Sequence, residues 1–366
     1  MPRLEELSAQ LGRLSDWDSG PFPVVSLYLN LQANDRGRNQ FEPFLRKELT
    51  DRLATYNTGT PERESLDKDI EKIRDYVDTL DPAINGLALF SSSGADLFEA
   101  IPLAAPVPDH RLYVSNSPHL YPLARLIDEY PRYAVLLADT QAARIFVFAV
   151  NALEQEQRIQ GIKTKHHKKG GMAQARYQRH AENYHLHHVR EVTDTLARIV
   201  REEEIPSIVI AGDEVVVPLL REELPKDIAE RVVDIVKVDM HASLRTVLET
   251  TIATMQEKDA ATDRERVDAL LDAYRGNGLG VVGVDRVRRA LEMGQVDELI
   301  ITARPETIDT PGGSQSEPAA ERTVEEKTAD ELIAKARQTS ASIRFIEDAS
   351  LLQPVGGVGA LLRFKL

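Results

Sequence analysis

The chain has 366 residues, of which 42% are hydrophobic and 28% charged, proportions typical of a globular protein with two or three domains. Its net charge is −14 and it has no cysteine, which excludes disulfide scaffolds, thiolate metal sites and cysteine nucleophiles. No apolar run is long enough to cross a bilayer and the first ten residues lack a signal-peptide core, so we expect a cytoplasmic protein with no membrane partner.

The first block, residues 1–130, is predicted to form an N-terminal α/β domain. Two helical stretches are separated by the turn-like Asn57-Thr58-Gly59-Thr60-Pro61, and a short helix ends the block. The four β-type runs predict a mixed sheet. The expected strands are 24–31, 86–90, 97–101 and 111–114, and the expected helices are 40–56, 62–80 and 120–129.

The second block, residues 131–272, is predicted to form a middle domain. It opens with an expected hairpin of strands 133–138 and 143–150, and a third strand is expected at 157–162. A polar loop at 163–172 and a long helix at 173–203 follow. Strands at 207–211 and 232–236 alternate with helices at 215–222 and 243–274, a pattern that favours a parallel sheet.

The third block, residues 273–366, is predicted to form a C-terminal α/β/α domain. Its expected elements are a helix through Glu292, a strand at 298–302, a helix at 324–338 and a strand at 342–346. Residues 306–323 are rich in Pro, Gly, Ser and Glu, so we expect a mobile insertion there.

Positive charge is concentrated in the middle block. The window from Arg158 to Arg190 holds eight basic residues and one acid, a net +7 in a chain of −14, and six of the nine histidines. A basic patch on an acidic body is typical of a protein that meets a polyanion at one place.

The glycine pair Gly170-Gly171 lies among these basic residues, just before the long helix. Glycines permit close approach of the main chain to a ligand, and a helix N-terminus favours phosphate or a developing oxyanion. The alternative, a flexible solvated loop between a strand and a helix, stays open.

Two weaker motifs have structural explanations. Gly278-x-Gly280-x-x-Gly283 matches a dinucleotide fingerprint, but helical residues precede it where a strand is required, so tight packing of a turn is favoured. Glu182, His185 and His188 share a helix face, yet zinc-protease spacing is absent and a polar helix surface is favoured. We expect no metal and no cofactor.

The segment around the glycine pair and two segments of the third block resemble a known family. The segment from His167 to Arg179, HKKGGMAQARYQR, resembles the GGQ loop and following helix of the archaeo-eukaryotic class I release factor and Pelota superfamily. Residues 283–300 and the terminal GGVGALLRF are similar to that family's C-domain signatures. The bacterial members, such as the hibernation factor Balon, are the expected relatives.

The resemblance implies a three-domain, tRNA-shaped factor with an L7Ae-like C-domain that enters the ribosomal A site. Its partners would be rRNA, the peptidyl transferase centre, P-site tRNA and, through the C-domain, a translational GTPase. By position, Gly170 and Gly171 match the glycines of the loop, and Met172 stands where the family has glutamine. The implied RNA-binding residues are Lys163, Lys165, His166, His167, Lys168, Lys169, Arg176 and Arg179.

Met172 divides the functional hypotheses. It keeps the main-chain N–H that stabilises an oxyanion but lacks the amide side chain that could order a water, so peptidyl-tRNA hydrolysis is weakened and stays open. The turn at Asn57-Thr58-Gly59-Thr60 lacks the family's Asn-Ile-Lys-Ser loop, and no Tyr-x-Cys motif exists, so we infer no stop-codon reading. The prediction is a hibernation or rescue factor; the alternatives are a release-type hydrolase, an off-ribosome RNA-binding or nuclease-like factor, and, third, a metal-dependent enzyme.

Overall fold

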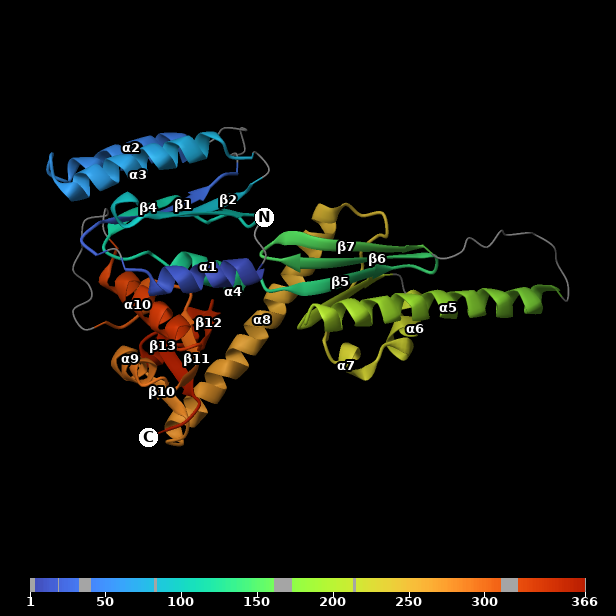
Figure 1. The fold of residues 1–366 in the computed structure, drawn as a ribbon. Helices are drawn as coiled ribbons and strands as arrows, with labels where there is room; N and C mark the ends of the chain where they lie inside the picture. Colours follow the sequence, from blue (N-terminus) through green and yellow to red (C-terminus); the bar gives the residue numbers. More distant parts are fainter. Residues whose placement is uncertain are drawn as a thin grey trace. The chain divides into compact units, whose positions relative to one another are not determined.

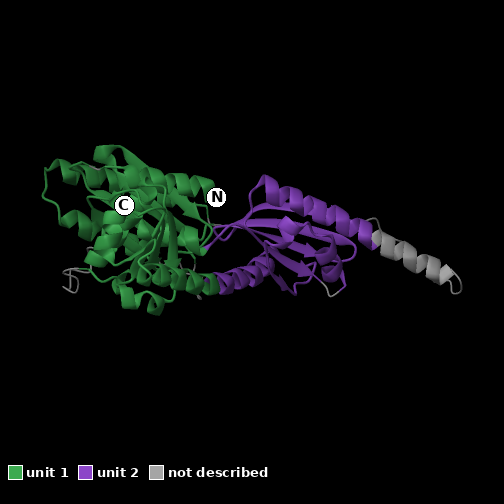
Figure 2. Ribbon diagram, turned by 90° about the horizontal axis from the view of Figure 1, so that it is seen from below, with its two compact units in different colours: residues 1–129, 260–366 green, residues 130–259 purple. Residues whose placement is uncertain are grey.

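Three β-sheets organise the part of the chain that the structure, a computed structural model, describes. These residues are 4–18, 20–32, 41–81, 84–160, 173–212, 215–310 and 322–365, without the side chains of 173–184. Residues 1–129 and 260–366 make up one compact unit and residues 130–259 another (Figure 2). The division into three domains stays a prediction, and its boundary at 272/273 falls inside helix α8 (Leu244–Arg275).

The N-terminal sheet has the strand order β3-β2-β1-β4, and helices α2 and α3 lie together over it (Figure 1). Val25, Leu27 and Leu29 alternate along β1 and pack against Leu49 and Ile70 of those helices. The elements are α1 (Leu4–Asp16), β1 (Val24–Asn30), α2 (Phe41–Ala54), α3 (Pro61–Asp78), β2 (Gly86–Ser92), β3 (Leu97–Leu103), β4 (Arg111–Ser115) and α4 (Tyr121–Glu129).

The prediction of a mixed N-terminal sheet is wrong in its strand directions, because all three strand pairs are antiparallel. A single crossover helix would return the chain for a parallel strand. Here two helices, α2 and α3, follow β1, and the second undoes the translation of the first, so β2 runs opposite to β1. Helix α1, which buries Leu7, Leu11 and Leu14, is a further element that was not predicted.

The C-terminal sheet has the order β10-β13-β11-β12, with β11 and β12 parallel and the other pairs antiparallel. The end of α8 packs Leu270 against Ile300 on one face, and α9 and α10 contact the same sheet and each other, giving α/β/α layers. The elements are β10 (Gly280–Val282), α9 (Val284–Glu292), β11 (Val296–Thr302), α10 (Val324–Gln338), β12 (Ser342–Ile346) and β13 (Val358–Leu362).

The expected mobile insertion at 306–323 is wrong at both ends. Ile308, Thr310 and Arg322 are buried, and Thr323 begins α10 with a capping box in which its side chain and that of Glu326 bond each other's backbone N–H. Composition does not predict the burial of Arg322, because this side chain is buried through ionic contacts rather than apolar packing. Residues 311–321 lie outside the described part of the chain.

The second unit is a five-stranded sheet of order β7-β6-β5-β8-β9. The predicted hairpin and parallel pairs are confirmed, since β5 pairs antiparallel with β6 and parallel with β8, which pairs parallel with β9. The elements are β5 (Tyr133–Ala138), β6 (Ala142–Ala149), β7 (Ala152–Gln160), α5 (Ala173–Glu202), β8 (Ser207–Gly212), α6 (Val216–Glu223), α7 (Lys226–Ala229), β9 (Val232–Val236) and the first part of α8.

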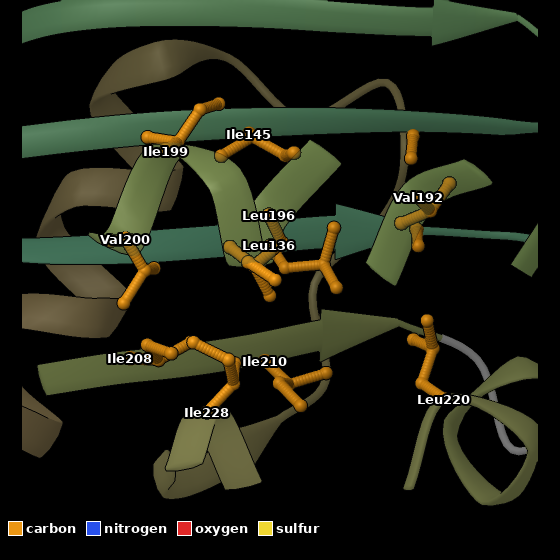
Figure 3. Packing of buried hydrophobic residues seen from close by; sticks show 14 of the residues in the cluster. Leu136, Ile145, Val192, Leu196, Ile199, Val200, Ile208, Ile210, Leu220 and Ile228 are labelled. Carbon is orange, nitrogen blue, oxygen red and sulfur yellow. The ribbon is translucent and has the colours of Figure 1, made fainter. Parts of the chain in front are cut away.

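Helices cover both faces of this sheet. Val192, Leu196 and Val200 of α5 pack on one face against strand residues such as Ile145 and Ile210 (Figure 3). On the other face, Val247 and Met255 of α8 pack with Phe146, Phe148 and Val209. None of the helices that the structure describes is long and apolar enough to span a membrane.

Leu196→Ala is expected to lower the free energy of unfolding by about 2–5 kcal/mol, because the side chain is fully buried between α5 and the sheet. Denaturant titration of the full chain measures it. The matched control is Arg190→Ala, on the same helix: its ion pair with Glu223 is exposed to solvent, which screens it, so the loss should be much smaller. If the two variants lowered the free energy of unfolding equally, apolar packing would not be the main interaction that holds α5 on the sheet.

Candidate functional site: the connection between β7 and α5

The glycine-containing segment connects the end of β7 to the start of α5. Residues 161–172 lie outside the described residues, as do the side chains of 173–184. The predicted site is therefore known by its attachment points, and the roles predicted for its members stay predictions. They are Lys163, Lys165, His166, His167, Lys168, Lys169, Gly170, Gly171, Met172, Arg176 and Arg179.

The first attachment point is the β6–β7 ladder, which extends to the last residue of β7, where Gln160 pairs with Ala142. Glu156 in β7 accepts hydrogen bonds from Arg158 at 2.7 Å and from Arg144 of β6 at 3.1 Å. The hydrogen bond from Arg158, with that from Arg144, lowers the pKa of the Glu156 carboxyl. The carboxylate therefore stays ionised at neutral pH and ties the two strands together beside the loop.

The second attachment point is α5, which is fixed along its C-terminal half. Besides its apolar face, Arg190 reaches Glu223 of α6 at 2.9 Å, and Arg201 reaches Asp227 of α7 at 2.8 Å. Hydrogen bonding from each guanidinium lowers the pKa of its carboxylate partner. Their stabilisation is present above the ordinary carboxyl pKa of about 4 and is lost as pH falls through the lowered values.

The helix places its N-terminus far from these contacts. At 1.5 Å per residue, Ala173 lies about 24 Å along the helix axis from Val189, which is the first apolar-core residue among those of α5 whose side chains the structure describes. The first backbone N–H groups of a helix have no partner within the helix, and in the sequence those of α5 follow Gly170-Gly171. This arrangement joins a basic, glycine-containing loop to a long helix whose far half is firmly held.

The histidines of α5 differ in their surroundings. His187 is exposed and His185 half-buried, whereas His188 is buried and neither of its ring nitrogens has a hydrogen-bond partner among the described residues. Within the same part of the chain, no three His, Cys, Asp or Glu side chains gather as metal ligands. His188 therefore belongs to the core side of α5 rather than to its polar face.

The Gly278-x-Gly280-x-x-Gly283 motif has the packing role that the sequence favoured. A Cβ on Gly280 would lie 2.7 Å from the Tyr274 nitrogen, and one on Gly278 3.2 Å from the Ala273 oxygen, so both glycines let the chain turn tightly against the end of α8. Gly283 has a φ of +84° directly before α9, a conformation that other residues rarely adopt.

The first unit holds a buried ionic cluster that was not predicted, centred on Asp330 of α10 with His119 and Arg322. No local signal distinguishes Asp330 from the other acidic residues of α10. Its partner His119 lies about two hundred positions earlier in the chain, so only the tertiary structure identifies it.

Two family models match adjoining parts of the chain. Residues 118–256 match "Bacterial archaeo-eukaryotic release factor family 10" and residues 260–366 match "eRF1 domain 3". The first match covers the β7–α5 connection, and the second covers the C-terminal sheet.

Curated relatives align over nearly the whole length. Peptide chain release factor subunit 1 of Aeropyrum pernix is 22% identical over 99% of this chain and 95% of its own. An uncharacterized protein of Mycobacterium tuberculosis is 23% identical over 93% of each chain. A structure titled as a model of ribosome-bound archaeal Pelota and ABCE1 is 15% identical, with a TM-score of 0.44, over 100% of this chain and 95% of that one.

The two models follow one another in chain order, and the release factor relatives span both regions. Residues 118–256 and 260–366 are thus each identified with an archaeo-eukaryotic release factor family, the first of them described as bacterial.

Proposed function

We propose that this protein is a cytoplasmic ribosome-binding factor that enters the A site without a stop codon and brings Gly170-Gly171-Met172 to the peptidyl transferase centre, protecting idle ribosomes or rescuing stalled ones. The observation that carries the proposal is the attachment of this basic loop to the N-terminal end of the long helix α5, about 24 Å from Val189, the first core residue among the described side chains of that helix. Such a helix delivers a loop into a narrow, RNA-lined site while the body of the protein stays outside.

Charge supports the same proposal. The lysines and arginines around the glycine pair would contact rRNA phosphates or the acceptor end of P-site tRNA, which positions the protein without reading sequence. A translational GTPase is the proposed partner of the C-terminal part, which matches a release factor domain.

The choice between occupancy and hydrolysis depends on Met172. A main-chain N–H at this position can stabilise an oxyanion, but the thioether cannot order an attacking water as an amide can. We therefore favour occupancy, with release-type hydrolysis of peptidyl-tRNA as the second candidate, favoured by the retained glycine pair.

The test is co-sedimentation with vacant 70S ribosomes, run beside release of labelled peptide from a stalled ribosome–peptidyl-tRNA complex. Binding without release supports an occupancy factor, and binding with release makes the protein a rescue hydrolase. Absence of binding in moderate salt, with equally tight binding to free structured RNA, would reject the ribosomal proposal in favour of an RNA-binding or nuclease-like factor.

A further inference from the structure

The most deeply buried ionic group among the described residues joins the N-terminal and C-terminal parts of the first unit. Asp330 of α10 is 5% exposed, Arg322 4% and His119, which directly precedes Leu120 and α4, 0%. Burying charges is costly unless each is paired and hydrogen-bonded. Whether this group stabilises the unit therefore depends on the contacts of these three residues.

The Asp330 carboxylate is fully engaged by donors from the N-terminal part and from Arg322. One oxygen accepts from His119 Nδ1 at 2.7 Å and from Arg322 Nη1 at 2.5 Å. The other accepts the backbone N–H groups of Leu120 and Tyr121 at 2.9 and 2.8 Å. These N–H groups lie at the start of α4, so Asp330 caps a helix about 210 residues away in sequence.

Arg322 adds contacts to the segment that leads into α4. Its guanidinium donates to the Ser117 carbonyl at 3.0 Å, to the Pro118 carbonyl at 3.3 Å and to the Ser115 hydroxyl. A planar guanidinium with several fixed donors fits only one arrangement of this backbone.

A second acidic residue of α10 bonds strand β4. Glu326 of α10 accepts from Arg111 Nη1 at 3.0 Å and from the Tyr113 hydroxyl at 3.3 Å. Together with Ser115, three alternate residues of β4 are thus bonded to the C-terminal part of the chain. We call the whole set the Asp330 cluster: Arg111, Tyr113, Ser115, His119, Arg322, Glu326 and Asp330.

Another buried polar contact joins the two parts, a hydrogen bond from the Tyr121 hydroxyl to the Thr302 carbonyl at 2.8 Å, but neither group is charged. The Arg125–Glu347 pair leaves the two side chains 29% and 52% exposed, and such pairs contribute little. Removing one partner from a buried pair is different, because the remaining charge is left without compensation. Among the described residues, the fully buried ionic contacts where the two parts meet are therefore concentrated at Asp330.

We propose that the Asp330 cluster is a conformational lock. With the carboxylate in place, residues 4–129 and 260–365 behave as one body and the β4 side chains are bonded to the protein itself. Without it, α4 and α10 separate while the N-terminal and C-terminal sheets each stay folded, and β4 becomes open to solvent or to a ligand. The lock does not depend on the proposed ribosomal function.

The test is Asp330→Asn in the full chain, followed by amide hydrogen exchange of peptides covering residues 116–126. We expect exchange at Leu120 and Tyr121 to become faster by about 100-fold or more, because the buried arginine loses its counter-charge. Peptides of β1, β2 and β11 should keep their protection, and the radius of gyration in solution scattering should increase.

The control is Glu331→Gln, the neighbouring position on the same helix with the same loss of charge. Glu331 is 38% exposed and bonds Arg288 and Lys335 of the C-terminal part. Its exchange pattern should match that of the unmodified protein. If Asp330→Asn leaves residues 116–126 protected, or if all sheets lose protection together, there is no lock.

A second variant tests the proposal in case Asp330→Asn does not fold. Arg322→Lys keeps the positive charge near Asp330 but loses the fork that bonds residues 115–118. We expect faster exchange confined to residues 115–121. Unchanged exchange in this variant would overturn the proposal, because the guanidinium contacts would then not hold the two parts together.

Discussion

Reversing Lys165, Lys168 and Lys169 to glutamate is expected to lower ribosome affinity by about 1,000-fold in moderate salt. The loop that carries these residues leaves the end of β7 and enters the start of α5, and the proposal places it against RNA phosphates. When one lysine no longer neutralises a phosphate, the slope of log affinity against log salt falls by about 0.7–0.9. Reversal adds repulsion to this effect, so three sites together give a large decrease in affinity.

The measurement is co-sedimentation with vacant ribosomes at several salt concentrations. The matched control reverses Arg221, Lys226 and Arg245, three exposed cations of the same unit, and so changes the net charge by the same amount. We expect the control to change affinity less than about 10-fold, through the long-range field alone. Equal decreases in both triple variants would mean that net charge, and not the loop, governs binding.

Met172→Gln is expected to raise the rate of peptide release by about 100-fold or more, if wild-type release is at background. The substitution restores the amide side chain that the family carries after its two glycines, and a single well-placed polar group in such a site contributes about 100- to 1,000-fold. The assay is release of labelled peptide from a stalled ribosome complex.

The double variant Gly171→Ala/Met172→Gln is the control for this gain. It should bind ribosomes as tightly as Met172→Gln but lose the acquired release, because a side chain next to residue 172 restricts the backbone that must approach the ester. If Met172→Gln binds ribosomes and releases nothing, the loop is not placed as in the release factors, and hydrolysis is rejected as a function of this scaffold.

Local sequence patterns predicted most elements of the second unit correctly. The strands Tyr133–Ala138 and Val232–Val236 and the start of α5 at Ala173 agree with the structure. Apolar spacing along the chain determines such elements, since each one buries its own face in the core. The turn between β6 and β7 was placed less well, because Val150 and Asn151 both adopt positive φ in a two-residue turn and a β-branched residue gives no turn signal.

The candidate site, too, has features that the sequence predicted and features that it did not. The basic window, the glycine pair and the following helix are local features, and the sequence was sufficient to find them. Their anchoring was not predictable, because Arg190 and Arg201 find Glu223 and Asp227 only after α6 and α7 pack beside α5.

Local sequence features were thus sufficient for the family resemblance, the position of the basic loop and the periodic helices and strands. The tertiary structure alone decided the antiparallel order of the N-terminal sheet, the burial of Arg322 and the Asp330 cluster. The physical reason is range: periodicity and capping act over a few residues, whereas Asp330 gains most of its donors from residues about 210 positions away. A buried charge is recognisable only when the groups that compensate it are in place.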